Sequence, residues 1–169
     1  EKLPKKDVVS WTSIVAGYTE YGHDEEALSC YRNLQLEGIA PNEVTFVCIL
    51  NCCGSLGALC TGKEIHTQII IKGLEKELFL GNSLINMYIK CKRIEAARKL
   101  FDEMTKHDLV TWNTMIGGYS ECGSADEALG LFYLMQYFGV PANPVTLVCI
   151  LKACSGIVAL ANGRMIHAY

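Results

Sequence analysis

The chain lacks both an excess of positive charge and a long apolar run. Fifteen Lys and Arg residues stand against 18 Asp and Glu residues, a net charge of −3. That balance argues against a protein that grips nucleic acid only through phosphates, but it is compatible with one that reads bases. The longest apolar stretches, 69–71 and 145–151, are far shorter than the roughly 18 residues of a membrane span. The first residues match neither a signal nor a transit peptide.

Disulfide and glycosylation patterns are also missing. The nine cysteines are an odd number, none is spaced C-x-x-C, and no Asn-x-Ser/Thr site accompanies them. This argues against a secreted disulfide scaffold and predicts small buried side chains in a reducing compartment. With 50% hydrophobic and 20% charged residues, the 169-residue chain is long and apolar enough to bury a core.

An internal repeat organises the chain. Residues 1–68 aligned on residues 102–169 give 26 identical positions. Asp7-Val-Val-Ser-Trp11 returns as Asp108-Leu-Val-Thr-Trp112, and Val44-Thr-Phe-Val-Cys-Ile-Leu50 returns as Val145-Thr-Leu-Val-Cys-Ile-Leu151. Self-similarity at a fixed period is the signature of a repeat architecture.

A shorter period lies inside the long one. The apolar pattern divides the chain into the tail of a preceding unit at 1–7, four units at 8–42, 43–77, 78–108 and 109–143, and an incomplete unit at 144–169. Because both ends fall inside units, we expect the chain to be part of a longer array. Within 109–143, apolar residues recur at three- and four-residue spacing on either side of Gly123-Ser124, which predicts two helices with Ser124 as an N-cap. Gly38 and Gly139 are expected to end the second helices. Helix pairs that cannot bury their apolar faces alone must stack, so we expect an all-α solenoid.

Several phrases indicate which helical repeat this is. The first helix reads Trp11-x2-Ile14-x2-Gly17-Tyr18, with Gly directly before Tyr, whereas a tetratricopeptide repeat has W-x2-L-G-x2-Y. Together with Asp126-Glu-Ala-Leu129, Phe101-Asp-Glu-Met104 and Gly57-Ala-Leu-x2-Gly-Lys-Glu-Ile-His66, this resembles the pentatricopeptide repeat family over the whole chain. The unit lengths of 35, 35 and 31 resemble its plant P-L-S subclass. In that scheme 1–7 ends an S-type repeat, 8–42 and 109–143 are P-type, 43–77 and 144–169 are L-type, and 78–108 is S-type.

The resemblance implies a right-handed superhelix that binds single-stranded RNA in a mitochondrion or chloroplast, one base per repeat. In the family, the fifth and last residues of a unit read the base and the second residue clamps it. Carried onto this chain, the base-reading pairs are Thr12 with Asn42, Asn82 with Asp108, and Asn113 with Asn143, and the clamping residues are Val9, Phe79 and Val110. By the same resemblance these pairs read adenine, uracil and a pyrimidine.

The residue types suit that role. Short amides, hydroxyls and carboxylates can match the Watson–Crick edge of a base, and an ionised Asp only accepts hydrogen bonds, so Asp108 favours the imide N–H of uracil. An alternative is that Asn and Asp at unit ends only form turns and helix caps, which suits Asn42 and Asn143 equally well. Asn82 and Asn113 fall inside helices, where Asn is disfavoured, and this favours function.

Unit 43–77 departs from the pattern. Its fifth and last residues are Val47 and Glu77, and the incomplete unit has Val148 in fifth position, so neither offers a base-reading pair. In the family, L-type units often contact proteins of the organellar editing machinery instead. Because unit 43–77 is expected to read no base, the expected RNA tract is A, any base, U, then a pyrimidine.

Other motifs carry no chemistry. Residues 57–63 match the start of a nucleotide-binding loop, but Glu64 occupies the position where that motif requires Ser or Thr. His23 and Glu25 match half of a zinc-deaminase signature, but we expect His23 in a solvated turn. His66 and His167 are expected to pack or hydrogen-bond between helices, and the basic cluster Lys90-Cys-Lys-Arg93 to form a turn or contact phosphates. We therefore expect no catalytic residue, metal site or cofactor.

Two functions fit the sequence best. The first is a sequence-specific RNA-binding module, part of a factor for C-to-U editing of organellar transcripts. The second is a protein-interaction solenoid that reads no RNA, which the negative charge and the L-type units favour. Asn and Asp residues in periodic register favour the first, because a protein-binding solenoid has no reason to place them there.

Overall fold

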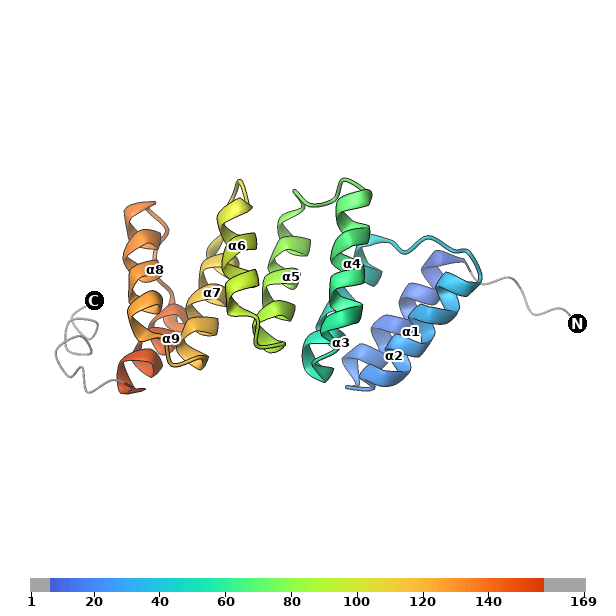
Figure 1. Cartoon of the computed structure of the whole chain (residues 1–169), viewed down its shortest axis with the longest axis horizontal. Helices are drawn as coiled ribbons and strands as arrows, with labels where there is room; N and C mark the ends of the chain where they lie inside the picture. Colours follow the sequence, from blue (N-terminus) through green and yellow to red (C-terminus); the bar gives the residue numbers. More distant parts are fainter. Residues whose placement is uncertain (1–6, 157–169) are drawn as a thin grey trace, which may run out of the picture. The chain divides into compact units, whose positions relative to one another are not determined.

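The computed structural model describes residues 7–156, and in that range it contains nine α-helices and no strand (Figure 1). The chain forms two compact units, 1–92 and 93–169. The first unit contains α1 (Val8–Glu20), α2 (Asp24–Leu36), α3 (Glu43–Leu56), α4 (Leu59–Ile71) and α5 (Leu78–Lys90). The second contains α6 (Ile94–Glu103), α7 (Leu109–Glu121), α8 (Ala125–Tyr137) and α9 (Pro144–Gly156).

Helices pack in the order of a solenoid. In the first unit α1 packs against α2 and α3, and α3 packs against α4 and α5. In the second unit α7 packs against α6, α8 and α9. A first helix thus contacts both its hairpin partner and the first helix of the next hairpin, so the fold is an all-α helical-repeat solenoid, as expected from the sequence. The predicted repeat starts at 8, 43, 78, 109 and 144 coincide with the first residues of α1, α3, α5, α7 and α9.

The first helices begin at side-chain caps. Asp7, Asn42, Asp108 and Asn143 each accept a hydrogen bond from the backbone N–H three residues ahead, at 2.8 or 2.9 Å. These bonds satisfy N–H groups that have no partner inside the helix. Helix α5 is different, because the side chain of its N-cap Glu77 makes no such bond.

The turns inside the hairpins depend on a left-handed residue rather than on a side-chain cap. Gly22, Gly57 and Gly123 have φ of 73°, 67° and 74°, and in each turn the next residue is the N-cap of the second helix. Ser124 is the N-cap of α8 as expected, but its side chain makes no capping bond. Gly38 and Gly139, also with positive φ, follow the ends of α2 and α8 as the sequence predicted.

Lys92 occupies the same turn between α5 and α6 with φ of 59°, where the other hairpins have glycine. A left-handed backbone conformation destabilises the folded state by about 1–2 kcal/mol when the residue is not glycine. Glycine removes this strain, but it lowers stability by about 0.5–1 kcal/mol because its unfolded chain is more flexible. We therefore expect Lys92→Gly to raise the free energy of unfolding by about 0.5–1 kcal/mol, measured by urea denaturation. The reverse change in the matched turn, Gly123→Lys, should lower it; an unchanged midpoint in both variants would contradict the account.

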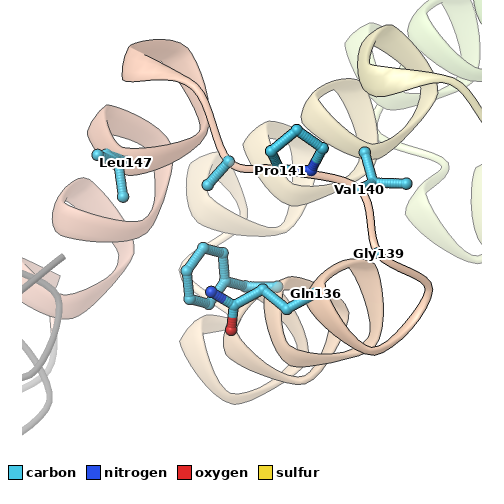
Figure 2. A pocket seen from close by; sticks show the side chains of 7 residues that line it. Gln136, Gly139, Val140, Pro141 and Leu147 are labelled. Carbon is cyan, nitrogen blue, oxygen red and sulfur yellow. The ribbon is translucent and has the colours of Figure 1, made fainter.

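The core of each unit lies where the helices face one another. In the first unit Phe46, Ile49, Leu50, Ile65 and Leu80 are all fully buried. In the second, Trp112, Met115, Phe132 and Ile150 are at most 2% exposed. A pocket of about 390 Å³ remains beside α8, the loop after it and α9, and Gln136, Pro141 and Leu147 are among the residues that line it (Figure 2). In the first unit the residue equivalent to Leu147 is Phe46. No helix within residues 7–156 is both long and apolar enough to cross a membrane.

Candidate functional site

Asn113 and Asn143 meet at the junction of α7 and α9. Asn113 Nδ2 donates to Asn143 Oδ1 at 3.2 Å, although the two residues are 30 positions apart. Asn143 Oδ1 also accepts from the backbone N–H of Thr146 at 2.9 Å, and the Thr146 hydroxyl lies 2.6 Å from Asn113 Oδ1. The fifth and last residues of unit 109–143, which the sequence paired, therefore form one polar cluster with a threonine of the next helix.

Thr12 and Asn42 meet in the same way at the junction of α1 and α3. Thr12 Oγ1 lies 3.3 Å from Asn42 Oδ1 and 2.8 Å from the hydroxyl of Thr45. It also donates to the carbonyl oxygen of Val8 at 2.7 Å. Asn42 Oδ1 caps α3 by accepting from Thr45 N–H at 2.9 Å.

Asn82 and Asp108 belong to different compact units of the chain. Asn82 is half-buried on α5. Asp108 caps α7: its Oδ1 accepts from both the N–H and the hydroxyl of Thr111 at 2.8 Å, and the Thr111 hydroxyl accepts from Asp108 N–H at 3.1 Å. This reciprocal capping box fixes the Asp108 carboxylate at the start of the helix.

Capping and base reading are not exclusive alternatives. The backbone N–H of Thr45 or Thr146 must meet an acceptor, so the oxygen of Asn42 or Asn143 faces the helix and the NH2 group is turned the other way. Asn42, Asp108 and Asn143 all act as helix caps, as the alternative from the sequence supposed, and their base-reading role stays a prediction. In Asn42 and Asn143 the capping bond uses the amide oxygen, and the NH2 group of the same side chain is a second polar group.

Exposed apolar side chains accompany these polar clusters. Val9, Phe79 and Val110, in second position, are 64%, 43% and 57% exposed. Each precedes the fifth residue by three positions, so the two side chains share one helix face. The carbonyls of these residues accept hydrogen bonds from Ser13, Ser83 and Thr114, four residues on. Exposed apolar groups beside polar ones can contact the face and the edge of the same planar ligand.

Unit 43–77 lacks the polar cluster, as expected. Val47 is half-buried and Glu77 is an exposed N-cap without a side-chain bond. The third residue of the following helix is Leu80, fully buried, instead of the threonine found at the other two junctions.

His23 and His66 lie where the sequence placed them. His66 Nδ1 is 2.9 Å from Tyr88 Oη, which links α4 to α5. His23 is exposed in the turn before α2, 3.8 Å from Glu26. His167 lies outside the described residues. In the basic cluster at 90–93, Lys90 ends α5 and residues 91–93 form the turn before α6.

The prediction that the cysteines are buried is only partly correct. All nine are free thiols, and Cys52, Cys53 and Cys154 are buried. Burial raises the pKa of Cys52 and of Cys53 to about 12, so both stay protonated at neutral pH. Cys60 and Cys122 are exposed instead; Cys60 lies in the first turn of α4 and Cys122 is the C-cap of α7. Among the described residues, no three His, Cys, Asp or Glu side chains are grouped so that they could hold a metal ion.

Sequence reasoning missed the threonines of the clusters. Thr45 and Thr146 are both fully buried and both contact the fifth residue of the preceding unit. Their signal was present, because threonine recurs in third position at 45, 111 and 146. Sequence alone does not distinguish these threonines from the other residues of the repeating pattern of the first helices.

The fold and these recurring clusters define a helical-repeat protein with one polar cluster at each of two helix junctions. The model of the PPR repeat family matches residues 6–55 and 107–156, and that of the PPR repeat matches residues 82–109. The chain therefore belongs to the pentatricopeptide repeat (PPR) family.

Relatives in Arabidopsis thaliana carry the same family name. One pentatricopeptide repeat-containing protein is 42% identical over 100% of this chain and 22% of its own length. A second, named chloroplastic, is 38% identical over 99% of this chain and 20% of its own length. A third, whose name is qualified as mitochondrial, is 34% identical over 100% of this chain and 27% of its own length. The chain thus spans only about a fifth to a quarter of these relatives.

Solved structures share the fold. The pentatricopeptide repeat protein PPR10 in complex with an 18-nt psaJ RNA element matches 99% of this chain and 25% of its own with a TM-score of 0.85 and 24% identity. The PPR domain of Arabidopsis thaliana protein-only RNase P 1 in complex with tRNA matches 92% of this chain and 84% of its own with a TM-score of 0.74 and 17% identity.

Proposed function

We propose that this chain is a sequence-specific, single-stranded RNA-binding module that reads one base per repeat. The observation that carries the proposal is the meeting of the fifth and last residues of two units, 3.3 Å apart for Thr12 and Asn42 and 3.2 Å apart for Asn113 and Asn143. Two polar groups held together in this way can bind one base edge. That solved relatives in fold are named as complexes with RNA supports the proposal.

The bound base would lie between an edge-reading pair and an apolar side chain. Val9, Phe79 and Val110 are exposed and can contact the faces of the bases, as stacking side chains do in other single-strand binders. Apolar contact with a base face is independent of sequence, whereas hydrogen bonds to its edge discriminate between bases. Affinity and specificity would thus come from different positions of the same helix.

The proposed register is A, any base, U, then a pyrimidine, with the RNA running 5′ to 3′ along the chain. Thr12 with Asn42 would read A, Asn82 with Asp108 would read U, and Asn113 with Asn143 would read the pyrimidine. Unit 43–77 would tolerate any base, because Val47 can neither donate nor accept a hydrogen bond.

The biological setting follows from the family. We propose a P-L-S protein of a mitochondrion or chloroplast that recognises sites of C-to-U editing, with the L-type unit 43–77 contacting proteins of the editing machinery. Relatives named chloroplastic and mitochondrial support the organelle. The role proposed for this chain is recognition, with no catalytic step assigned to its residues.

A protein-interaction solenoid is the second candidate. Leu36, Ile71 and Tyr137 are 85%, 79% and 84% exposed at the ends of second helices. Exposed apolar side chains of this kind are common at protein interfaces. Binding that is insensitive to the RNA sequence but retained by a protein partner would favour this candidate.

RNA binding by the chain alone is expected to be weak, with micromolar or weaker affinity. Three reading units and a net charge of −3 leave few phosphate contacts, which supply most of the sequence-independent affinity. Fluorescence anisotropy should show weak binding to an RNA with the A-N-U-Y tract, and weaker binding when its three specified bases are replaced. Nanomolar binding to RNA of random sequence would contradict base reading.

A further inference from the structure

The residue in third position of each repeat changes together with the fifth residue of the repeat before it. Where the fifth residue is polar, the third residue of the next repeat is threonine, and where the fifth residue is valine, the third residue of the next repeat is leucine. The pairs are Thr12 and Thr45, Val47 and Leu80, Asn82 and Thr111, and Asn113 and Thr146. The N-cap changes in the same register, because Glu77 makes no side-chain capping bond before Leu80, so capping accounts for the pattern in part. A role for the threonine beyond capping rests on its contact with the fifth residue, at 2.8 Å for Thr45 and Thr12 and 2.6 Å for Thr146 and Asn113.

Thr146 shows how. Its side chain is fully buried, and its hydroxyl oxygen accepts from the backbone N–H of Asn143 at 3.1 Å. A hydroxyl has a single proton to donate. The shorter of its two contacts to an amide oxygen, 2.6 Å, is to Asn113 Oδ1, and the other, 2.9 Å, is to Asn143 Oδ1. The hydroxyl therefore donates preferentially to Asn113.

This bond determines the orientation of the Asn113 amide. With Oδ1 on Thr146, Nδ2 is turned to Asn143 Oδ1, which is 3.2 Å away. The two ends of an amide are nearly the same size, so hydrogen bonds alone distinguish one orientation from its flipped form. If the hydroxyl were removed, the amide could exchange its donor and acceptor ends.

We propose that Thr146 is a positioning residue for base selection: it holds the Asn113 amide in one orientation and so fixes which hydrogen-bonding groups the unit 109–143 presents to its base. The inference rests on the proposed function for its RNA consequence, but the amide orientation can be measured without RNA. Thr45 has a lesser role, because Thr12 has no amide to flip and already donates to the carbonyl oxygen of Val8.

The test compares Thr146→Val, which removes the hydroxyl at similar volume, with Thr146→Ser, which keeps it. RNAs differing only in the fourth base are titrated against the whole chain at high protein concentration. The pyrimidine-over-purine ratio should fall about five-fold or more in Thr146→Val, stay in Thr146→Ser, and leave selection of the third base unchanged. Thr67→Val, which removes an exposed hydroxyl that donates to the carbonyl oxygen of Lys63 on α4, is the control and should preserve the ratio at every base. An equal loss of affinity for every RNA, with the ratio intact, would overturn the proposal.

A second measurement separates this proposal from the proposed function. In NMR spectra of the RNA-free chain, the Asn113 side-chain NH2 protons should exchange slowly with water in the wild type and in Thr146→Ser, and faster in Thr146→Val. Unchanged exchange in Thr146→Val overturns the positioning role whatever the RNA data show. If exchange accelerates but the wild type shows no base preference at any position, the orientation is right and the proposed function is wrong. Backbone amide signals of α1 to α5 report whether the rest of the chain stays folded.

Discussion

Replacing Asp108 by Asn is expected to reduce the preference for U over C at the third base of the tract about five-fold or more. An ionised carboxylate only accepts hydrogen bonds, so it matches the N3–H of uracil and is poorly matched to the N3 acceptor of cytosine. An amide supplies the donor that cytosine N3 needs. A well-placed base contact contributes about 1–3 kcal/mol of discrimination, which sets the size of the change.

The substitution should leave the fold intact because the cap survives. Asp108 Oδ1 accepts from the N–H and hydroxyl of Thr111, and Asn143 Oδ1 accepts from the N–H of Thr146. An Asn at 108 can therefore cap α7 as Asn143 caps α9. Only the other end of the side chain then changes, from a carboxylate oxygen to an NH2 group.

The measurement needs the chain embedded in a longer array so that affinities are high enough to compare. RNAs with U or C in third position are titrated against wild type and Asp108→Asn. Asn143→Asp is the reciprocal control and should move the fourth position towards U. Lys92→Ala, by contrast, should weaken all sequences alike or do nothing, because a phosphate contact carries no sequence information. If binding persists in Asp108→Asn with an unchanged U to C ratio, the register is wrong.

The solenoid was predictable because it follows from local periodicity. Apolar residues spaced three and four positions apart define the buried helix faces, and glycines such as Gly38 and Gly139 mark where helices end. The helix starts were predictable for a similar reason, since Asp, Asn and Thr at fixed offsets make capping bonds. Both depend on interactions within a few residues of sequence.

The polar clusters were only partly predictable, because they join residues about 30 positions apart. From the sequence, capping and base reading by Asn42 and Asn143 are competing roles. The structure shows that the Oδ1 atom of each side chain makes the capping bond, while its NH2 group is turned away from the helix. It also overlooked Thr146, whose contact with Asn113 depends on how α9 packs against α7. Helix packing, which no local rule supplies, makes these contacts.

Helix packing also sets the largest expected effect on stability. Phe46 lies on α3, the helix that packs against α1, α2, α4 and α5, and its side chain is fully buried. Phe46→Ala should lower the free energy of unfolding of the first unit by about 3–5 kcal/mol, the usual loss for a buried phenyl ring and the cavity it leaves. Urea denaturation, with hydrogen exchange of the α1–α5 amides, measures the loss.

The equivalent residue of the second unit provides the control. Leu147 is half-buried on α9 and lines the pocket of about 390 Å³ beside α8 (Figure 2). Because its side chain already borders empty space, Leu147→Ala removes fewer contacts and should cost about 2 kcal/mol or less. Leu147→Phe, which copies the first unit, should be tolerated for the same reason, since the larger ring can extend into the pocket. Equal losses for Phe46→Ala and Leu147→Ala would mean that the two junctions are packed alike, contrary to the burial of their side chains.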